Sequence, residues 1–199
     1  MPNLFRNKYR IPSARHPNWD YRWNAAYFIT ICTDNRTHYF GEIKNGQMQL
    51  SHIGVIADLL WYEIKNHAQC IKLGAFVVMP NHIHGVLILD NPDNDGGIDD
   101  VKTRDALSLH QNNRQNDHQS QKSIGQKRLR NPGKNSISTI IGGYKSAVTK
   151  HANRLHYPFK WQARFYDHII RDEKSFHTIS NYINNNPQKW DEDKFYNKP

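Results

Sequence analysis

With 199 residues, of which 37% are hydrophobic, the chain is long enough to form one domain with a sizeable core. Its 27 lysines and arginines against 18 aspartates and glutamates give a formal charge of +9, which favours an anionic polymer as partner. Two distant cysteines argue against a disulfide scaffold, and no apolar stretch resembles a signal peptide or a membrane span. We therefore expect a cytoplasmic protein that contacts no membrane.

The first part of the chain predicts an arm followed by strands and a helix. Residues 1–24 are polar, basic and aromatic, and we expect an irregular arm. The β-branched and aromatic residues of 25–33 predict a strand. After a short strand at 48–50, Ser51 can cap a helix whose apolar residues recur at helical spacing.

The middle of the chain contains two apolar runs and a polar segment. The runs, 71–79 and 83–89, are separated by Pro80-Asn81, which indicates either a tight link between paired strands or a bulge in one strand. Residues from about 91 to 135 are rich in Asn, Gln, Asp, Ser and Lys and contain no aromatic residue. We expect a mobile polar insertion there, because such a segment buries little apolar surface.

The last part of the chain predicts a helix, a strand and a second helix. Apolar residues at helical spacing predict a helix over 136–154, and residues 161–170 are typical of a strand. Asp172 can cap a final helix, which Pro187 should end near residue 186.

This order of elements indicates the fold class. The predicted order is strand, strand, helix, strand, strand, helix, strand, helix. This order favours the α+β class, with helices packed on an antiparallel sheet. We expect one domain over 25–190, interrupted by the polar insertion and followed by a tail at 191–199.

His82 and His84 are the most informative residues of the chain. Side chains two apart in a strand project from the same face, so these imidazoles can meet one metal ion while Ile83 points into the core. A pair of satisfied structural histidines is the other interpretation of this spacing.

Tyr182 and Asn186 lie four residues apart in the predicted final helix. They therefore share a face, next to the apolar face formed by Phe176, Ile179 and Ile183. If that face looks across the sheet at the histidines, two imidazoles and an amide oxygen can bind an ion beside a phenol. Packing of the tyrosine is the alternative.

These motifs resemble a known family. The run Met79-Pro80-Asn81-His82-Ile83-His84 is similar to the histidine-hydrophobe-histidine motif of the single-tyrosine HUH transposases. The stretch Trp161-Gln162-x-Arg164-Phe165-Tyr166-Asp167, followed by Tyr182-Ile183-Asn184-Asn185-Asn186-Pro187, looks like the branch associated with repetitive extragenic palindromes. The resemblance spans most of 25–190 outside the polar insertion.

The resemblance implies a ferredoxin-like HUH nuclease arrangement and a specific chemistry. His82, His84 and Asn186 correspond to ligands of a divalent metal ion, Mg²⁺ or Mn²⁺, and Tyr182 corresponds to the nucleophile. The implied reaction is cleavage and rejoining of single-stranded DNA beside a hairpin, through a covalent 5′-phosphotyrosine link. Members of the family act as monomers or homodimers.

Basic and aromatic side chains are candidates for contact with the DNA, since single strands bind to cationic surfaces with stacking platforms. The candidates in the arm and in the second half of the chain are Arg6, Arg10, Arg15, Trp19, Arg22, Lys145, Lys150, Arg154 and Arg164.

Three other interpretations compete with this one. Tyr144, in the run Gly142-Gly143-Tyr144-Lys145-Ser146, is a second candidate nucleophile, although it lies on the apolar stripe of its helix. A histidine-triad hydrolase needs a further alternate histidine where this chain has Val86. A non-catalytic module that binds single-stranded nucleic acid on an RRM-like sheet explains the charge and the aromatics equally well.

Overall fold

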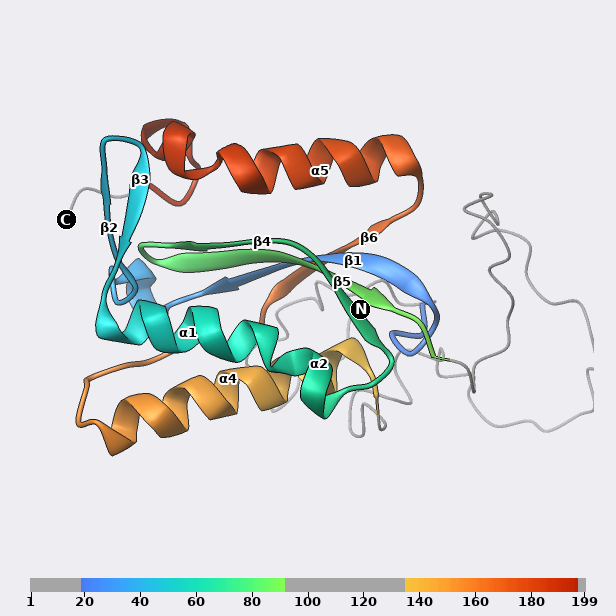
Figure 1. Ribbon diagram of the computed structural model, residues 1–199, viewed down its shortest axis with the longest axis horizontal. Helices are drawn as coiled ribbons and strands as arrows, with labels where there is room; N and C mark the ends of the chain where they lie inside the picture. The colour runs from blue at the N-terminus through green and yellow to red at the C-terminus, as the bar shows by residue number, and fades with distance from the viewer. Residues whose placement is uncertain (1–18, 92–134, 197–199) are drawn as a thin grey trace, which may run out of the picture.

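The computed structural model of the chain describes residues 19–91 and 135–196, and its centre is a four-stranded antiparallel sheet. The strand order is β4 (Ile71–Met79), β5 (His82–Leu89), β1 (Ala25–Cys32), β6 (Tyr166–Ile170). A separate two-stranded ribbon, β2 (Gly41–Lys44) and β3 (Gln47–Leu50), stands at one end of the sheet (Figure 1).

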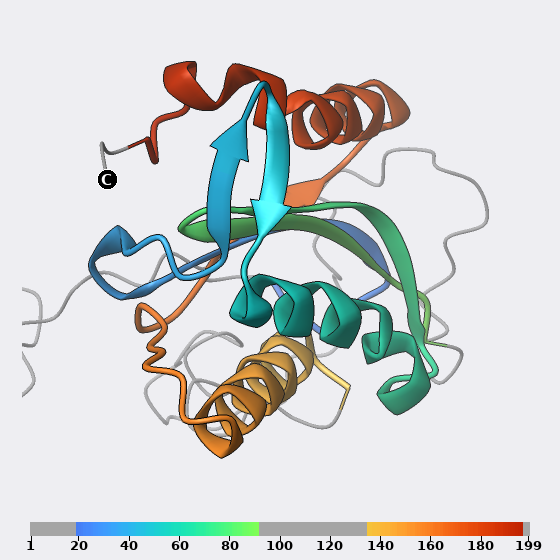
Figure 2. The same ribbon diagram turned by 60° about the vertical axis from the view of Figure 1, so that its left-hand side comes forward.

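Helices cover both faces of the sheet (Figures 1 and 2). One face carries α1 (His52–Tyr62), α2 (Ile64–His67) and α4 (Ile137–Arg154), and the other carries α5 (Glu173–Asn185). Two 3₁₀ segments complete the described fold, η2 (Asp34–Arg36) after β1 and η3 (Pro187–Glu192) after α5. The α+β class, with helices on an antiparallel sheet, is confirmed.

Strand periodicity divides the apolar residues between two cores. On β1, Tyr27, Ile29 and Ile31 point toward α1 and α4 and are fully buried. A smaller core under α5 contains Val86, Ile170 and Ile183. Because β5 is covered on both faces, nearly all of its residues are buried, rather than every second one.

Each predicted helix start is confirmed by a side-chain cap. The Ser51 hydroxyl accepts from the Gly54 N–H at 3.1 Å, and the Asp172 carboxylate accepts from the Ser175 N–H at 2.7 Å. The Ser136 hydroxyl caps α4 in the same way. These polar residues fix where the helices begin because they satisfy N–H groups that lack partners within the helix.

The structure differs from the sequence prediction at the last strand. The expected strand over 161–170 begins only at Tyr166, because Arg164 has a left-handed backbone (φ 68°) that interrupts extended structure. Trp161 makes a single bridge to Thr33. Pro80-Asn81 is the tight link between β4 and β5, with Met79 paired to His82.

Parts of the expected domain organisation lie outside the described residues. Residues 1–18 of the arm and 92–134 of the polar insertion fall there, whereas residues 19–24 are described, with turns and bends at 21–24. The tail expected at 191–199 begins within η3. In the described ranges 19–91 and 135–196, no helix combines the length and apolar character needed to cross a bilayer.

Gly85 permits a close contact that fixes α1 against β5. A Cβ at this position would lie 2.3 Å from Cζ2 of the buried Trp61 ring. Phe76 of β4, which is paired with Gly85, stacks on the same indole ring, with ring centroids 4.6 Å apart. The indole therefore occupies the space of the missing side chain, one residue from His84.

Replacing Gly85 by alanine should destabilise the fold. We expect Gly85→Ala to lower the free energy of unfolding in urea by about 1–3 kcal/mol, because the added carbon forces Trp61 out of place. Gly143→Ala is the matched control, since nothing lies within 4 Å of its added Cβ in α4. Removing a helical glycine should raise stability by about 0.5–1 kcal/mol. Equal effects of the two substitutions would contradict this account.

Candidate metal centre and tyrosine site

The register of β5 against β1 places His82 and His84 on the sheet face that α5 covers. His84 is paired with Thr30, and His82 with Cys32. The two imidazole centroids are 4.5 Å apart, and the residues are 0% and 1% exposed. Both predicted ligand residues therefore meet inside the protein, as the strand period requires.

His82 is held with one ring nitrogen ready to bind a metal ion. Its Nδ1 lies 2.8 Å from Asn81 Oδ1, and Asn81 Nδ2 donates to the Phe195 carbonyl at 2.9 Å. The amide oxygen of Asn81 thus faces the ring, so Nδ1–H is the donor and Nε2 carries a lone pair. Among the described residues this buried Nε2 has no hydrogen-bond partner. Such an arrangement is typical of a metal-binding histidine oriented by a neighbouring carbonyl.

His84 joins the strand to the helix. Its Nδ1 lies 2.9 Å from Thr30 Oγ1, and its Nε2 lies 3.2 Å from Tyr182 Oη. The Tyr182 hydroxyl donates its proton to Asp193, so toward His84 it can only accept. The Nε2–H tautomer of His84 therefore donates to Tyr182 Oη, and its Nδ1 accepts from the Thr30 hydroxyl. On binding a metal ion through Nε2, the ring would instead donate Nδ1–H to Thr30.

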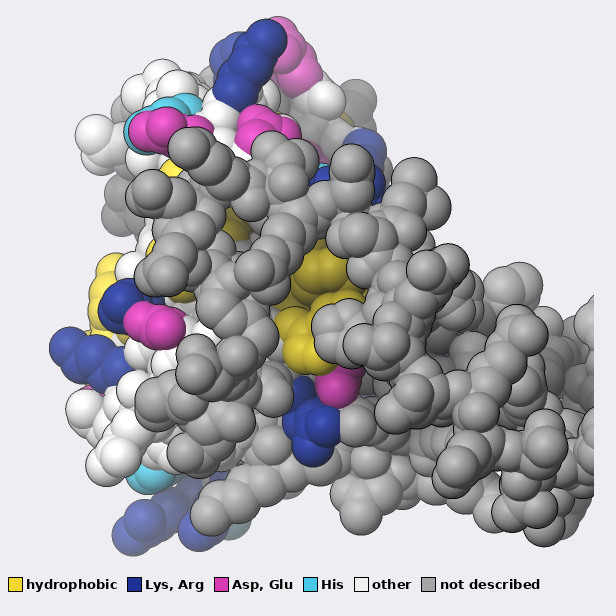
Figure 3. Space-filling view, turned by 90° about the vertical axis from the view of Figure 1, so that its right-hand side faces the viewer, with side chains coloured by type: hydrophobic (Ala, Val, Ile, Leu, Met, Phe, Trp, Pro, Cys, Tyr) yellow, Lys and Arg dark blue, Asp and Glu magenta, His cyan; other side chains and the backbone are white. Residues whose placement is uncertain are grey.

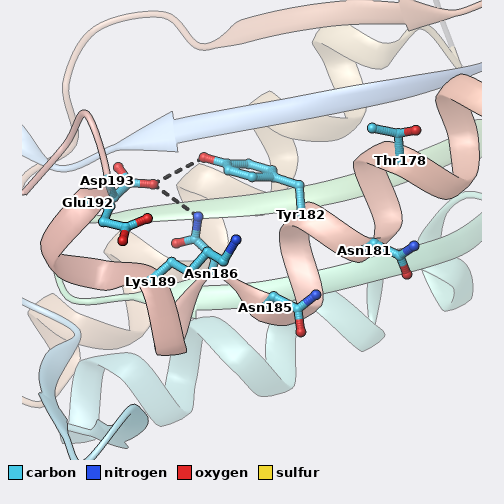
Figure 4. Close-up of a pocket in the computed structure, with 8 residues that line it drawn as sticks. All are labelled: Thr178, Asn181, Tyr182, Asn185, Asn186, Lys189, Glu192 and Asp193. Carbon is cyan, nitrogen blue, oxygen red and sulfur yellow. Dashed lines mark hydrogen bonds between the residues drawn. The ribbon is translucent and has the colours of Figure 1, made fainter.

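Tyr182 and Asn186 converge on Asp193 (Figure 4). The Tyr182 hydroxyl donates to Asp193 Oδ2 at 3.1 Å, and Asn186 Nδ2 donates to the same oxygen at 3.0 Å. Asp193 Oδ1 accepts from the Phe195 N–H at 2.7 Å. The hydrogen bond from Nδ2 to Asp193 fixes the orientation of the Asn186 amide. Its buried Oδ1 has no hydrogen-bond partner among the described residues.

The protein environment sets the charge of these groups. Burial lowers the pKa of His82 well below its ordinary value and lowers that of His84 to about 4, so both rings are neutral at pH 7. Neutral imidazole is the form that binds metals. Burial and the neighbouring Asp193 raise the pKa of Tyr182 to about 12, so the phenol keeps its proton in this arrangement.

The donor set fits a divalent metal ion. Ligand atoms of His82, His84 and Asp193 lie within 4.8 Å of one another, and the group could hold a metal ion. Nε2 of His82, within this group, and Oδ1 of Asn186, beside it, are buried acceptors without a hydrogen-bond partner among the described residues. A cation is the species that satisfies several buried acceptors at once.

Asp193 and Asn81 were missed by the sequence analysis. Asp193 lies in the expected tail, at no informative spacing from a motif residue, among neighbouring acids that look like a solvated surface. Asn81 was interpreted only as a turn residue. Its position directly before His82 is a signal that could have been used, since asparagine can orient a neighbouring imidazole.

Tyr144, the competing candidate nucleophile, is a core residue. It is 4% exposed, and its hydroxyl donates to the Ala57 carbonyl at 2.8 Å. Burial raises its pKa well above the ordinary value. The hydroxyl therefore joins α4 to α1, on the side of the sheet opposite Tyr182.

The described DNA-contact candidates lie apart from the site. Lys145, Lys150 and Arg154 are on α4, across the sheet from α5 (Figure 1). The Lys145 ammonium donates to the carbonyls of Gln162 and Arg164 at 2.8 and 2.9 Å.

Trp19 donates to the Tyr27 hydroxyl, Arg22 pairs with Asp20, and Arg164 is exposed. Arg6, Arg10 and Arg15 fall outside the described residues. A DNA-binding role for all nine residues stays a prediction.

Comparisons with known proteins agree with this fold. No family model matches the chain. An uncharacterized protein of Haemophilus influenzae is 36% identical over 185 residues, covering 92% of each chain. A solved structure of a REP-associated tyrosine transposase bound to a REP hairpin has a TM-score of 0.53, at 15% identity, over 90% of this chain and 74% of that chain.

These findings show which fold the chain has and which protein it is related to. The chain has the fold of a tyrosine transposase, with helices on both faces of an antiparallel sheet. It belongs to the same family as the Haemophilus influenzae protein.

Metal binding should stabilise the protein through His82. We expect Mn²⁺ to raise the thermal midpoint, since saturation at 100-fold above the dissociation constant adds about 2.7 kcal/mol. His82→Ala should abolish the rise, and Asn81→Ala should weaken binding by about 10–100-fold by releasing the ring. His168→Ala, an exposed histidine on β6, is the control. An undiminished rise in His82→Ala would contradict the assignment.

Loss of the Tyr144 hydroxyl should affect stability. We expect Tyr144→Phe to lower the free energy of unfolding by about 1 kcal/mol, because a buried hydrogen bond is lost. The exposed Tyr62→Phe is the control and should leave urea unfolding unchanged. A Tyr144→Phe protein as stable as the wild type would rule out the structural role.

Proposed function

We propose that this chain cleaves and rejoins single-stranded DNA, with Tyr182 as nucleophile and His82, His84 and Asn186 as ligands of a divalent metal ion. The observation that carries the proposal is the 3.2 Å contact of Tyr182 Oη with His84 Nε2, next to two buried acceptors that have no partner among the described residues. Both acceptors are groups that a divalent metal ion would satisfy. The transposase of similar fold was solved with a DNA hairpin, which supports the choice of substrate.

The chemistry follows from the positions of the side chains. Tyr182 Oη would form a bond to a backbone phosphorus while the bond to the 3′-oxygen breaks, leaving a 3′-hydroxyl and a 5′-phosphotyrosine. Asp193 Oδ2, 3.1 Å from the phenol, is in position to receive its proton. A bound divalent ion would supply the positive charge that attracts the phosphate and favours the phenolate. Attack by another 3′-hydroxyl on the phosphotyrosine phosphorus would form a new phosphodiester bond, break the bond to Tyr182 Oη and release the phenol, which takes back a proton.

The residues favour Mn²⁺ over Mg²⁺ as the ion. Two imidazoles make a softer donor set than the carboxylates and waters of a usual Mg²⁺ site. In the described structure Tyr182, both histidines, Asn186 and Asp193 meet within one chain.

A non-catalytic RRM-like module is disfavoured by the layers of the fold. Such a module stacks bases on an open sheet face. Here α5 packs over β4 and β5, and the residues of β5 are almost entirely buried.

Formation of a covalent adduct tests the proposal. A labelled DNA hairpin with randomised single-stranded flanks, incubated with Mn²⁺, should give a band of protein-linked DNA on a denaturing gel. Tyr182→Phe should abolish the band, since no other hydroxyl occupies that position. Asn186→Ala should reduce it about 10–100-fold by removing a ligand. Absence of an adduct with wild-type protein, or its persistence in Tyr182→Phe, would refute the proposal.

Asn185→Ala is the matched control for Asn186→Ala. Asn185 precedes Asn186 in the chain but is exposed, whereas Asn186 is 2% exposed. The control variant should form the adduct at the wild-type rate. Equal loss in the two variants would show that Asn186 has no special role.

A further inference from the structure

Cationic and aromatic side chains alternate along a surface beside the Tyr182 site. The Arg36 guanidinium carbon lies 4.8 Å from the Phe195 ring centroid. The Lys194 ammonium lies 4.8 Å from the same centroid and 5.9 Å from that of Tyr166. We call Arg36, Phe195, Lys194 and Tyr166 the cation–aromatic row.

The cation–aromatic row begins at the histidines and ends at the sheet edge. The Phe195 centroid is 4.6 Å from that of His82 and 5.9 Å from that of His84. Tyr166 is paired with Thr30, which is paired with His84 on its other side. Paired residues project from the same face of a sheet, so Tyr166 and His84 share the face of the site.

Tyr166 is open to a ligand because it begins the edge strand β6, at the opposite end of that strand from Ile170, which packs under α5. The helix packs over β4 and β5, whereas β6 forms the edge of the four-stranded sheet. Tyr166 is 49% exposed, on the face where Val86 of β5 and Ile170 of β6 are buried. An exposed aromatic ring at this place can stack on an unpaired base.

The backbone is strained where it presents Arg36. Asn35 and Arg36 both have left-handed conformations, with φ of 51° and 54°. Arginine seldom adopts this conformation, and consecutive left-handed residues are rarer still. The turn brings Arg36 to the Phe195 ring and lets its Nη1 donate to the Lys194 carbonyl at 3.0 Å. Strain of this kind is typical of functional segments.

The pocket beside Tyr182 carries both acidic and basic side chains. It has a volume of about 350 Å³ and is lined by polar side chains, including the acids Glu192 and Asp193 and the cation Lys189 (Figure 4). The far end of the molecule, where α5 begins, carries acidic and basic side chains together (Figure 3). Arg36 and Lys194 add positive charge next to this pocket, which favours a phosphate backbone on their side.

We propose that the cation–aromatic row binds the single-stranded DNA segment adjoining the scissile phosphate. Arg36 and Lys194 contact phosphates, and Tyr166 stacks on a base. The assignment of this substrate rests on the proposed function. The row itself supplies the two features that single strands require, cations along a path and an exposed aromatic platform.

The affinity for single-stranded DNA, measured with a variant that cannot cleave it, tests the proposal. The probe is a fluorescent single-stranded DNA without a hairpin, titrated by anisotropy with the full-length Tyr182→Phe protein in EDTA. Adding Tyr166→Ala should weaken binding about tenfold or more, as loss of one stacking platform does. Tyr166→Phe should bind like the parent protein, because it keeps the ring.

Tyr62→Ala is the matched control for the stacking residue. Tyr62 is 50% exposed, nearly the same as Tyr166, but lies on α1 across the sheet. Its removal should leave the affinity unchanged. Equal losses for Tyr166→Ala and Tyr62→Ala would overturn the proposal, as would an unmeasurable affinity of the parent protein or equal affinity for a duplex of the same length.

Salt dependence tests the cationic part of the row. Lys194→Gln should make the slope of log K against log salt shallower by about 0.7, the value for one phosphate contact on a single strand. Lys65→Gln, an exposed lysine on α2, should leave the slope unchanged. An unaltered slope in Lys194→Gln would show that this side chain contacts no phosphate and would overturn its assignment.

The two proposals fail separately. An adduct at Tyr182 together with unchanged binding by Tyr166→Ala would refute the row and leave the cleavage chemistry intact. Dependence of binding on Tyr166 without any adduct would refute the chemistry and leave a single-strand-binding surface.

Discussion

The antiparallel register between β1 and β5 is the constraint on which the site depends. It pairs His84 with Thr30 and turns both histidines toward α5, while Ile83 enters the opposite core. A shift of one residue would exchange the two faces and put imidazoles among the apolar side chains under α1. The buried side chains of β1 resist that shift, since Tyr27, Ile29 and Ile31 would lose their packing. The same packing that stabilises the larger core therefore fixes the chemistry on the other face.

Hydrogen bonds then turn this pair of histidines into a prepared site. Asn81 orients His82, Thr30 orients His84, and Asp193 collects the donors of Tyr182 and Asn186. The network satisfies its donors and leaves two buried acceptors without partners among the described residues. A buried polar atom without a hydrogen-bond partner costs roughly 1–3 kcal/mol in a folded protein. Binding a cation would remove that cost, and it would bring positive charge next to a phenol whose pKa is now about 12.

Local patterns in the sequence predicted the elements and four of the site residues. Strand and helix periods placed His82 with His84 and Tyr182 with Asn186, and side-chain caps marked where the helices begin. The sequence could not predict contacts that depend on tertiary approach. Asp193 reaches the site only because η3 folds the chain back after α5, and the extent of β6 depends on the left-handed Arg164. The row formed by Arg36, Phe195, Lys194 and Tyr166 joins three distant segments, so no spacing reveals it.

The central claim is that one metal ion joins the strand histidines to the tyrosine helix. Anomalous diffraction from crystals of the protein soaked in Mn²⁺ measures this directly. The account predicts one strong peak within bonding distance of His82 Nε2, His84 Nε2 and Asn186 Oδ1, adjacent to Tyr182 Oη. A peak bound elsewhere, or none while His82 Nε2 stays unpartnered, would contradict it.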